Sequence, residues 1–252
     1  QTMVDRHLRS ILGARFGVHE EEIFWATTFM VPESELEEAL QRHGAESVRW
    51  GTNTEGYRIL LRLRGGDEPA RRAFFTRLRG ELGAERIVEG RAEIGKVVLD
   101  DLRRTGRRLV CAESCTGGLV AKLVTDVPGS SEGVWGGFVA YSNTAKTGIL
   151  GVSERTLAEN GAVSPETAGE MALGALERSG EDAGIAVAIT GIAGPEGGTE
   201  EKPVGTVWLA VALDGRVLET RHVFLPRDRD RVRRWSAISA LLLVREALSE
   251  VA

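Results

Sequence analysis

Three groups of polar side chains in this 252-residue chain have types and spacing that suit chemistry at a carbonyl group. Each group follows an apolar run that predicts a short buried strand. They are residues 112–118 (Ala-Glu-Ser-Cys-Thr-Gly-Gly), residues 141–146 (Tyr-Ser-Asn-Thr-Ala-Lys) and the glycine-rich stretch 190–203. Loops that follow the strands of an open α/β sheet tend to meet at one edge. We therefore expect the three groups to face one pocket.

Ser114 is the candidate nucleophile, and a serine needs a base. The only histidine after residue 43 is His222, which falls inside a predicted strand and is interpreted as structural. Lys146 is the alternative base. To act at neutral pH it must lose its proton, which requires its pKa to fall by about 3 units, equivalent to about 4 kcal/mol. Burial or a nearby positive charge produces such a shift, and Tyr141 could hold the lysine or relay the proton. Taken alone, Lys146 is better explained as a solvated helix lysine.

The run 109–124 predicts a strand, a tight turn and a helix around Ser114. Backbone N–H groups of Cys115, Thr116 and Gly117 at the helix start could hold an oxyanion. Glu113 adds a carboxylate and Cys115 a thiol, so a cysteine nucleophile is an alternative. With Lys146, these groups indicate hydrolysis of an amide or ester. An ordinary capped turn is the other explanation of this stretch.

The stretch 190–203 has glycines at 191, 194, 197 and 198, whose backbone N–H groups could approach an anion. Lys202 would add positive charge, as would Arg229 and Arg233 at the start of the last predicted helix. The spacing matches neither a P-loop nor G-x-G-x-x-G. A mobile surface loop explains the stretch equally well.

The composition favours a small-molecule partner and argues against several others. The formal net charge is −5, and residues 1–90 hold 13 Arg and no Lys against 15 acidic residues, so no nucleic-acid partner is expected despite a nominal G-x-x-G at Gly80–Gly83. The two cysteines lie four residues apart, which excludes a disulfide framework and suits the cytoplasm. No metal-ligand spacing is found. The longest apolar run, 237–244, is too short to cross a bilayer.

The pattern of elements predicts two domains after a helical segment in residues 1–20, interpreted as the remnant of a missing domain. Residues 21–90 predict a small α+β domain. Its signals are a capping box at Ser34 and Glu37, strands at 47–51 and 57–63 joined through 53–56, and a helix from Asp67. Alternating helices and strands then predict a three-layer α/β/α domain with a mixed sheet over 91–252. Because apolar residues exceed what one sheet needs, we expect a homodimer.

At this point a family resemblance adds to the analysis. AESCTGG (112–118), YSNTAK (141–146), GAVSP (161–165) and TGIAGPEGGTEEKPVG (190–205) closely resemble the C-terminal domain of the CinA family. The resemblance implies a nicotinamide mononucleotide amidohydrolase without a cofactor or metal, which yields nicotinate mononucleotide and ammonia in pyridine nucleotide recycling. It implies Ser114 as the nucleophile, activated by Tyr141 and Lys146, with Thr190 and Arg229 near the substrate. The expected substrate-binding set is Glu113, Cys115, Thr116, Gly117, Asn143, Thr190, Gly191, Gly194, Gly198, Lys202 and Arg229.

Residues 20–90 resemble, more weakly, the linking domain of the longer CinA proteins. We expect the large N-terminal domain of that family, and its associated ADP-ribose pyrophosphatase activity, to be missing. The chain has Arg227 near the position where the family has a glycine before Arg-x-x-Val-Arg, which weakens the assignment of Arg229. The alternative function is a non-catalytic module that senses a pyridine nucleotide or ADP-ribose.

Overall fold

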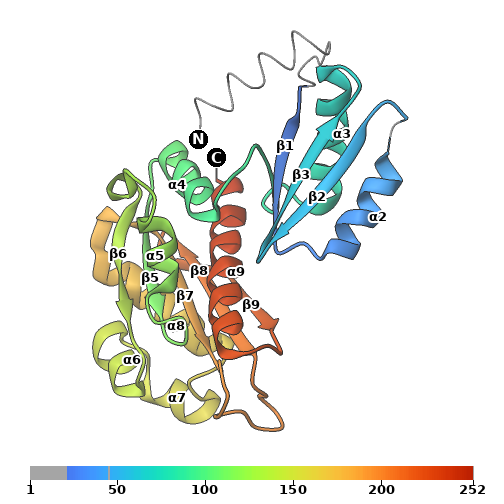
Figure 1. Cartoon of the computed structure of the whole chain (residues 1–252). Coiled ribbons are helices and arrows are strands. Elements are labelled where there is room, and N and C mark those ends of the chain that lie inside the picture. The colour runs from blue at the N-terminus through green and yellow to red at the C-terminus, as the bar shows by residue number, and fades with distance from the viewer. Residues whose placement is uncertain (1–21, 45, 252) are drawn as a thin grey trace, which may run out of the picture. The chain divides into compact units, whose positions relative to one another are not determined.

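The computed structural model describes residues 22–44 and 46–251. The chain divides into two compact units, residues 1–91 and residues 92–252, and each is described here by itself. The helical segment predicted in residues 1–20 lies outside the described residues. Figure 1 shows the elements of both units.

The first unit is a four-stranded antiparallel sheet with two helices. Its strands run in the order β2-β3-β1-β4, and all its neighbouring pairs are antiparallel. Leu36 and Leu40 of one helix, and Phe74 and Leu78 of the other, are buried in one core with the strands. The predicted α+β fold is confirmed. The elements are β1 (Phe24–Phe29), α2 (Glu33–His43), β2 (Arg49–Glu55), β3 (Arg58–Arg64), α3 (Glu68–Leu82) and β4 (Ile87–Glu89).

Two local predictions in this unit were wrong. Helix α2 begins at Glu33 with Pro32 as its N-cap, because the Pro32 carbonyl accepts the first helical hydrogen bond, from Leu36. Ser34 therefore lies inside the first turn and does not cap the helix. The β2–β3 hairpin is also tighter than predicted. Glu55 pairs with Arg58, because a left-handed Gly56 (φ 66°) makes the turn in two residues.

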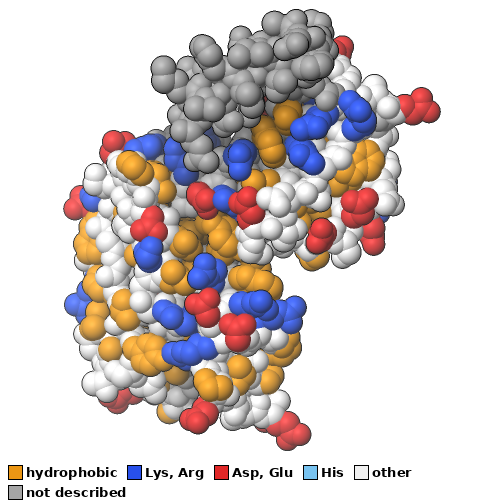
Figure 2. Space-filling model, in the orientation of Figure 1, with side chains coloured by type: hydrophobic (Ala, Val, Ile, Leu, Met, Phe, Trp, Pro, Cys, Tyr) orange, Lys and Arg blue, Asp and Glu red, His pale blue; other side chains and the backbone are white. Residues whose placement is uncertain are grey.

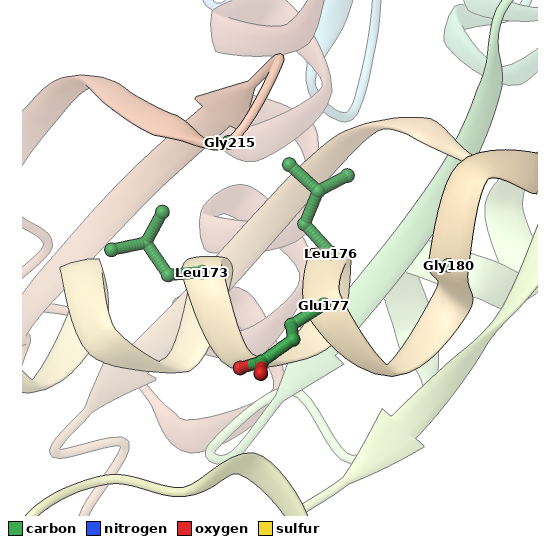
Figure 3. Close-up of a pocket in the computed structure, with 5 residues that line it drawn as sticks. All are labelled: Leu173, Leu176, Glu177, Gly180 and Gly215. Atoms are coloured by element: carbon green, nitrogen blue, oxygen red, sulfur yellow. The ribbon is translucent and has the colours of Figure 1, made fainter.

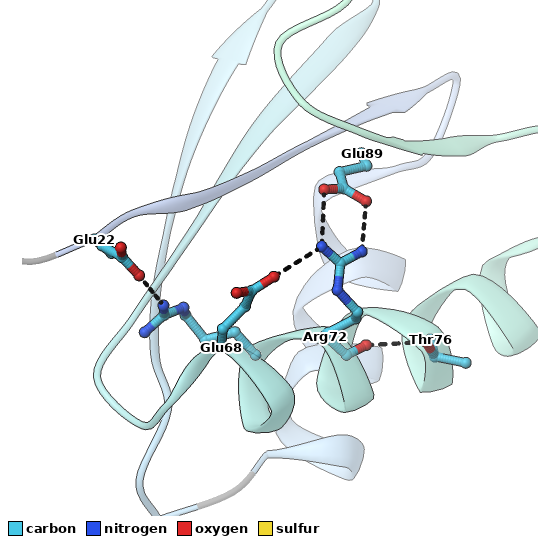
Figure 4. Close-up of polar contacts among 6 residues, drawn as sticks. Glu22, Glu68, Arg72, Thr76 and Glu89 are labelled. Atoms are coloured by element: carbon cyan, nitrogen blue, oxygen red, sulfur yellow. Dashed lines mark hydrogen bonds and ion pairs between the residues drawn. The ribbon is translucent and has the colours of Figure 1, made fainter.

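Charged side chains along α3 connect this helix to its neighbours (Figure 4). Arg72 donates to Glu89 of β4 at 3.0 Å and to Glu68 at 3.1 Å, and Arg71 donates to Glu22 at 3.1 Å. Ion pairs at exposed sites contribute about 0–1 kcal/mol each. The fold of this unit therefore depends mainly on its buried apolar core.

The second unit carries the three predicted polar groups. Its sheet has the order β6-β5-β7-β8-β9, in which β6, β5 and β7 are parallel while β8 and β9 are antiparallel to their neighbours. The predicted mixed sheet is confirmed. The elements are α4 (Ile94–Thr105), β5 (Arg108–Glu113), α5 (Leu119–Thr125), η1 (Ser130–Glu132), β6 (Val134–Val139), α6 (Asn143–Leu150), α7 (Glu154–Asn160), α8 (Pro165–Ser179), η2 (Gly180–Asp182), β7 (Gly184–Gly191), β8 (Thr206–Leu213), β9 (Arg216–Phe224) and α9 (Arg229–Ser249).

Helices cover both faces of this sheet, which gives three layers. Helix α8 packs on one face together with α6 and α7, and α4, α5 and α9 pack against one another on the other (Figure 1). The side facing α8 is lined by alanines on β5, β7 and β8, including Ala112, Ala188 and Ala210. These small side chains let α8 approach closely, and the segment before α8 lies at the carboxyl ends of the parallel strands, where Thr190 contacts Ala162.

Three observations concern the classes of partner. No helix among residues 22–44 and 46–251 is long and apolar enough to cross a membrane. Within the same residues no group of His, Cys, Asp and Glu side chains could hold a metal ion. On the face shown in Figure 2, basic, acidic and hydrophobic side chains intermingle over both units. Gly80 of the nominal G-x-x-G lies inside α3, so this motif does not form a loop.

Candidate active site

Ser114 lies at a sharp corner between β5 and α5. The corner, residues 114–118, turns through Gly117 (φ 62°) and Gly118 (φ 94°), two left-handed positions that favour glycine. The strand before it is buried on both faces, and Ser114 itself is 7% exposed. We call residues 114–118 the nucleophile corner.

Lys146 reaches the corner from α6. Ser142 caps this helix by accepting from the N–H of Ala145, which sets Lys146 one turn inside. A Cβ at Gly174 of α8 would lie 1.8 Å from the Leu150 carbonyl oxygen, so only glycine lets the end of α6 pack this close to α8. The Lys146 amine lies 3.1 Å from the Ser114 hydroxyl oxygen. The predicted contact between the two side chains is present.

The Lys146 amine is buried among three oxygen atoms. The side chain is 1% exposed, and burial lowers its pKa below the usual value of 10.5. Its Nζ also donates to the carbonyls of Ala140 (3.0 Å) and Tyr141 (3.2 Å). A neutral amine has two hydrogens and one lone pair. When the lysine is neutral, the two carbonyls, which can only accept, take both hydrogens, and the lone pair can then accept from the hydroxyl of Ser114.

A cavity of about 180 Å³ opens beside this pair. It lies at the carboxyl ends of β5 and β7, where an α/β sheet usually holds its ligand. Seven of the predicted site residues line it, and Ala162, Val163 and Ala193 complete the wall. The seven are Ser114, Cys115, Tyr141, Lys146, Thr190, Gly191 and Arg229.

The wall at Ala162 and Val163 is held by hydrogen bonds to the segment before α8. Thr190 at the end of β7 donates to the Ala162 carbonyl at 2.6 Å. Lys202 donates to the Asn160 carbonyl at 2.7 Å, and Thr167 to the Gly161 carbonyl at 2.7 Å. Thr190 and Lys202, both predicted to bind substrate, are thus engaged with the protein main chain.

Arg229 and Tyr141 lie together at the rim of the cavity. Arg229 donates to the Gly194 carbonyl at 2.7 Å and to the Tyr141 hydroxyl at 3.3 Å. The Tyr141 side chain is 59% exposed, and its hydroxyl makes no hydrogen bond to Ser114 or Lys146 in the described structure. It is the main-chain carbonyl of Tyr141, and not its phenol, that holds the lysine.

Several predicted site residues do not line the cavity. The buried Glu113 carboxylate accepts from the N–H groups of Gly118, Val120 and Ala121, and so it caps α5. This carboxylate takes the place at the helix start where a ligand was expected. The Gly117 N–H, predicted to hold an oxyanion, donates to the Ser114 carbonyl. The others that lie outside the lining are Thr116, Asn143, Gly194, Gly198 and Lys202. His222 lies in β9 with its ring 5.0 Å from that of Trp208.

The thiol of Cys115 is poorly suited to act as the nucleophile. It lines the cavity but is 5% exposed, and burial raises its pKa to about 12. The reactive thiolate is therefore scarce at neutral pH. The main chain of Cys115 has a different contact, because Arg233 of α9 donates to the carbonyls of Cys115 (3.2 Å) and Thr116 (2.8 Å).

A larger hollow of about 460 Å³ lies elsewhere on this unit, beside α8. Figure 3 shows Leu173 and Leu176 projecting toward the β8–β9 turn at Gly215, while Glu177 points to the other side of the helix. Its lining contains no nucleophile with an adjacent base. The smaller cavity is the one with reactive groups in contact.

A sequence profile of the CinA C-terminal domain matches residues 91–248. The chain belongs to the CinA family. A CinA-like protein of Geotalea uraniireducens is 45% identical over 207 residues, which cover 80% of this chain and 48% of that protein. The nicotinamide-nucleotide amidohydrolase PncC of Enterobacter agglomerans is 50% identical over 161 residues, which cover 64% of this chain and 94% of that protein.

Solved CinA structures show the same fold. A competence/damage-inducible protein from Agrobacterium tumefaciens is 43% identical and superposes with a TM-score of 0.58, covering 62% of this chain and 94% of that one. The chain spans about half the length of the longer CinA-like relatives it matches. The site described above lies wholly inside the matched CinA domain.

Proposed function

We propose that this chain is a serine amidohydrolase that converts nicotinamide mononucleotide to nicotinate mononucleotide and ammonia. The observation that carries the proposal is the buried contact of 3.1 Å between Lys146 Nζ and Ser114 Oγ. The name of the related PncC protein, nicotinamide-nucleotide amidohydrolase, supports this choice of substrate.

The first half of the reaction forms an ester on Ser114. Neutral Lys146 removes the hydroxyl proton while Oγ attacks the amide carbon, which becomes tetrahedral with a negative oxygen. We assign as donors for this oxygen the N–H of Cys115, which lines the cavity, and the N–H of the next residue, Thr116, because neither donates to an oxygen of the described residues. Protonated Lys146 then gives its proton to the departing nitrogen, the C–N bond breaks, and ammonia leaves.

The second half repeats these steps with water. Lys146, neutral again, takes a proton from a water molecule that attacks the ester carbonyl. The bond to Oγ breaks, Ser114 regains its proton from Lys146, and the carboxylic acid of nicotinate mononucleotide is released and ionises.

The cavity size indicates which part of the nucleotide enters. Its volume of about 180 Å³ is below the roughly 300–1,000 Å³ typical of pockets that enclose a whole ligand. The amide-bearing ring therefore occupies the cavity, and the ribose phosphate extends past the rim. Arg229 lies at that rim, and its planar guanidinium suits a phosphate.

The test is ammonia release from nicotinamide mononucleotide, with product identified by chromatography. We expect Lys146→Ala to lower kcat by about 10²–10⁴-fold, the usual contribution of a general base, and Ser114→Ala to lower it at least as far, because the covalent route is lost. Lys122→Ala is the matched control, because this lysine is an exposed residue of α5 that pairs with Asp126. Saturable nucleotide binding without product would favour a sensing module instead, and unchanged turnover in either variant would refute the mechanism.

A further inference from the structure

Arg233 contacts the nucleophile corner without lining the cavity. It lies on α9, one helical turn after Arg229, and its side chain is half-buried. Its Nε donates to the Cys115 carbonyl at 3.2 Å and its Nη2 to the Thr116 carbonyl at 2.8 Å. One planar, charged group therefore holds two consecutive peptide oxygens of the corner.

Holding these carbonyls determines where the neighbouring N–H groups point. The C=O and N–H of a trans peptide point in opposite directions. With its oxygen on Arg233, the Cys115–Thr116 peptide directs the Thr116 N–H away from α9. The next peptide, also held by Arg233, directs the Gly117 N–H to the Ser114 carbonyl at 3.1 Å. That bond in turn orients the Ser114–Cys115 peptide and its N–H.

The opposite end of the corner is held by Glu113. Its carboxylate accepts from Gly118 N (2.9 Å), Val120 N (3.1 Å) and Ala121 N (2.9 Å). The donors at the start of α5 are thereby used inside the protein. Of the N–H groups at the corner, those of Cys115 and Thr116 donate to no oxygen of the described residues, and we assign both to the substrate oxygen, although only Cys115 is itself part of the cavity lining.

Arg233 also acts on the strength of one of these donors. A charged donor on a carbonyl polarises the whole peptide, since hydrogen bonds in a chain strengthen one another. The guanidinium on the Cys115 oxygen makes the Thr116 N–H a better donor to a negative oxygen. Lysine cannot replace it, because an ammonium lacks the planar fork that reaches both carbonyls.

We propose that Arg233 is a positioning residue that aims and polarises the Thr116 N–H toward the oxygen that becomes negative in the transition state. This inference rests on the proposed amidohydrolase function. It assigns Arg233 to the main chain of the corner, and leaves the phosphate of the substrate to other groups.

The experiment compares nicotinamide mononucleotide with its thioamide analogue, in which sulfur replaces the amide oxygen. Sulfur accepts hydrogen bonds weakly, so the oxyanion donors help the thioamide less. In Arg233→Lys and Arg233→Ala we expect kcat for the amide to fall by about 10–100-fold, less than the roughly 10²–10³-fold cost of losing one oxyanion donor, because the N–H itself remains. We expect kcat for the thioamide to change by less than about threefold, and KM to stay within about twofold for both.

Arg234→Ala is the matched control, because its side chain on the same helix is exposed and pairs with Asp230. Partial unfolding of a variant lowers both rates equally and leaves their ratio unchanged. An equal fall for amide and thioamide, or wild-type turnover in both Arg233 variants, would therefore overturn the inference.

A second arm separates this inference from the choice of substrate. The acylation of Ser114 by p-nitrophenyl acetate uses the same oxyanion donors but no nucleotide. If the wild type reacts with the ester and not with nicotinamide mononucleotide, the proposed substrate is wrong. In that case, slower acylation in the Arg233 variants than in Arg234→Ala still supports the role of Arg233. A wild type inert to both compounds would refute the site and the inference together.

Discussion

The guanidinium of Arg229 donates to the phenolic oxygen of Tyr141 at 3.3 Å, across the rim of the cavity. This contact separates two roles of Tyr141, because its main-chain carbonyl holds Lys146 while its side chain orients Arg229. The chemical step should depend on the first and substrate binding on the second.

Tyr141→Phe should therefore affect KM more than kcat. The main-chain contact to Lys146 survives the substitution, whereas Arg229 loses one partner. We expect KM to rise by about tenfold and kcat to stay within about threefold, since this exposed contact belongs at the low end, about 1.5 kcal/mol, of what a hydrogen bond to a charged group is worth. Steady-state kinetics of ammonia release measure both, and a large loss in kcat alone would show that the phenol takes part in proton transfer.

The lowered pKa of Lys146 predicts how stability changes with pH. Between its folded pKa and the unfolded value near 10.5, the unfolded chain binds the extra proton, so the free energy of unfolding rises with pH. Lys146→Met lacks this group. The stability of the wild type should consequently increase relative to Lys146→Met as the pH is raised from 7 toward 10. Denaturant unfolding of the two proteins across this range tests the sign, and parallel curves would contradict it.

Cys115→Ala should retain most activity. Burial keeps the thiol protonated and shields it from reagents, so it contributes little as a nucleophile. We expect turnover within about threefold of the wild type and slow alkylation by iodoacetamide. If alkylation abolishes ammonia release while Ser114→Ala remains active, the nucleophile is the cysteine.

Thr190→Val should loosen the cavity wall. The substitution keeps the shape of the side chain but removes the donor to the Ala162 carbonyl. We expect a loss of about 0.5–1.5 kcal/mol in unfolding free energy, the usual net contribution of one hydrogen bond, because the half-buried Ala162 carbonyl can turn to water in the cavity, and a higher KM. Thr144→Val, at an exposed position of α6, is the matched control. Equal stability and KM in the two variants would count against a structural role for Thr190.

Much of the fold and the central pair of the site could be predicted from the sequence. Ser114 and Lys146 follow neighbouring parallel strands, and the geometry of such sheets brings the ends of these strands to one edge. The apolar strand 185–190 and the helix cap at Ser164 were likewise readable from local patterns, and both are present in β7 and α8.

Other contacts could not be predicted, because they depend on side-chain direction and on distant segments. The Glu113 side chain caps α5, and the amino-acid sequence of this stretch does not show which way that side chain points. Arg233 meets Cys115 across 118 residues of sequence, and no spacing rule connects them. Asn143 and Gly198 belong to the correct polar groups but do not line the cavity, because only some residues of each group reach the sheet edge.

The central claim is that an uncharged Lys146 deprotonates Ser114, and the pH dependence of kcat tests it most directly. Ammonia release at saturating nicotinamide mononucleotide should rise with pH through a single ionisation below 10.5 and then level off. Lys146→Arg, which keeps the charge but does not lose its proton, should be slower by about 10²–10⁴-fold at every pH. A rate in Lys146→Arg equal to that of the wild type, or a wild-type rate independent of pH, would contradict the account.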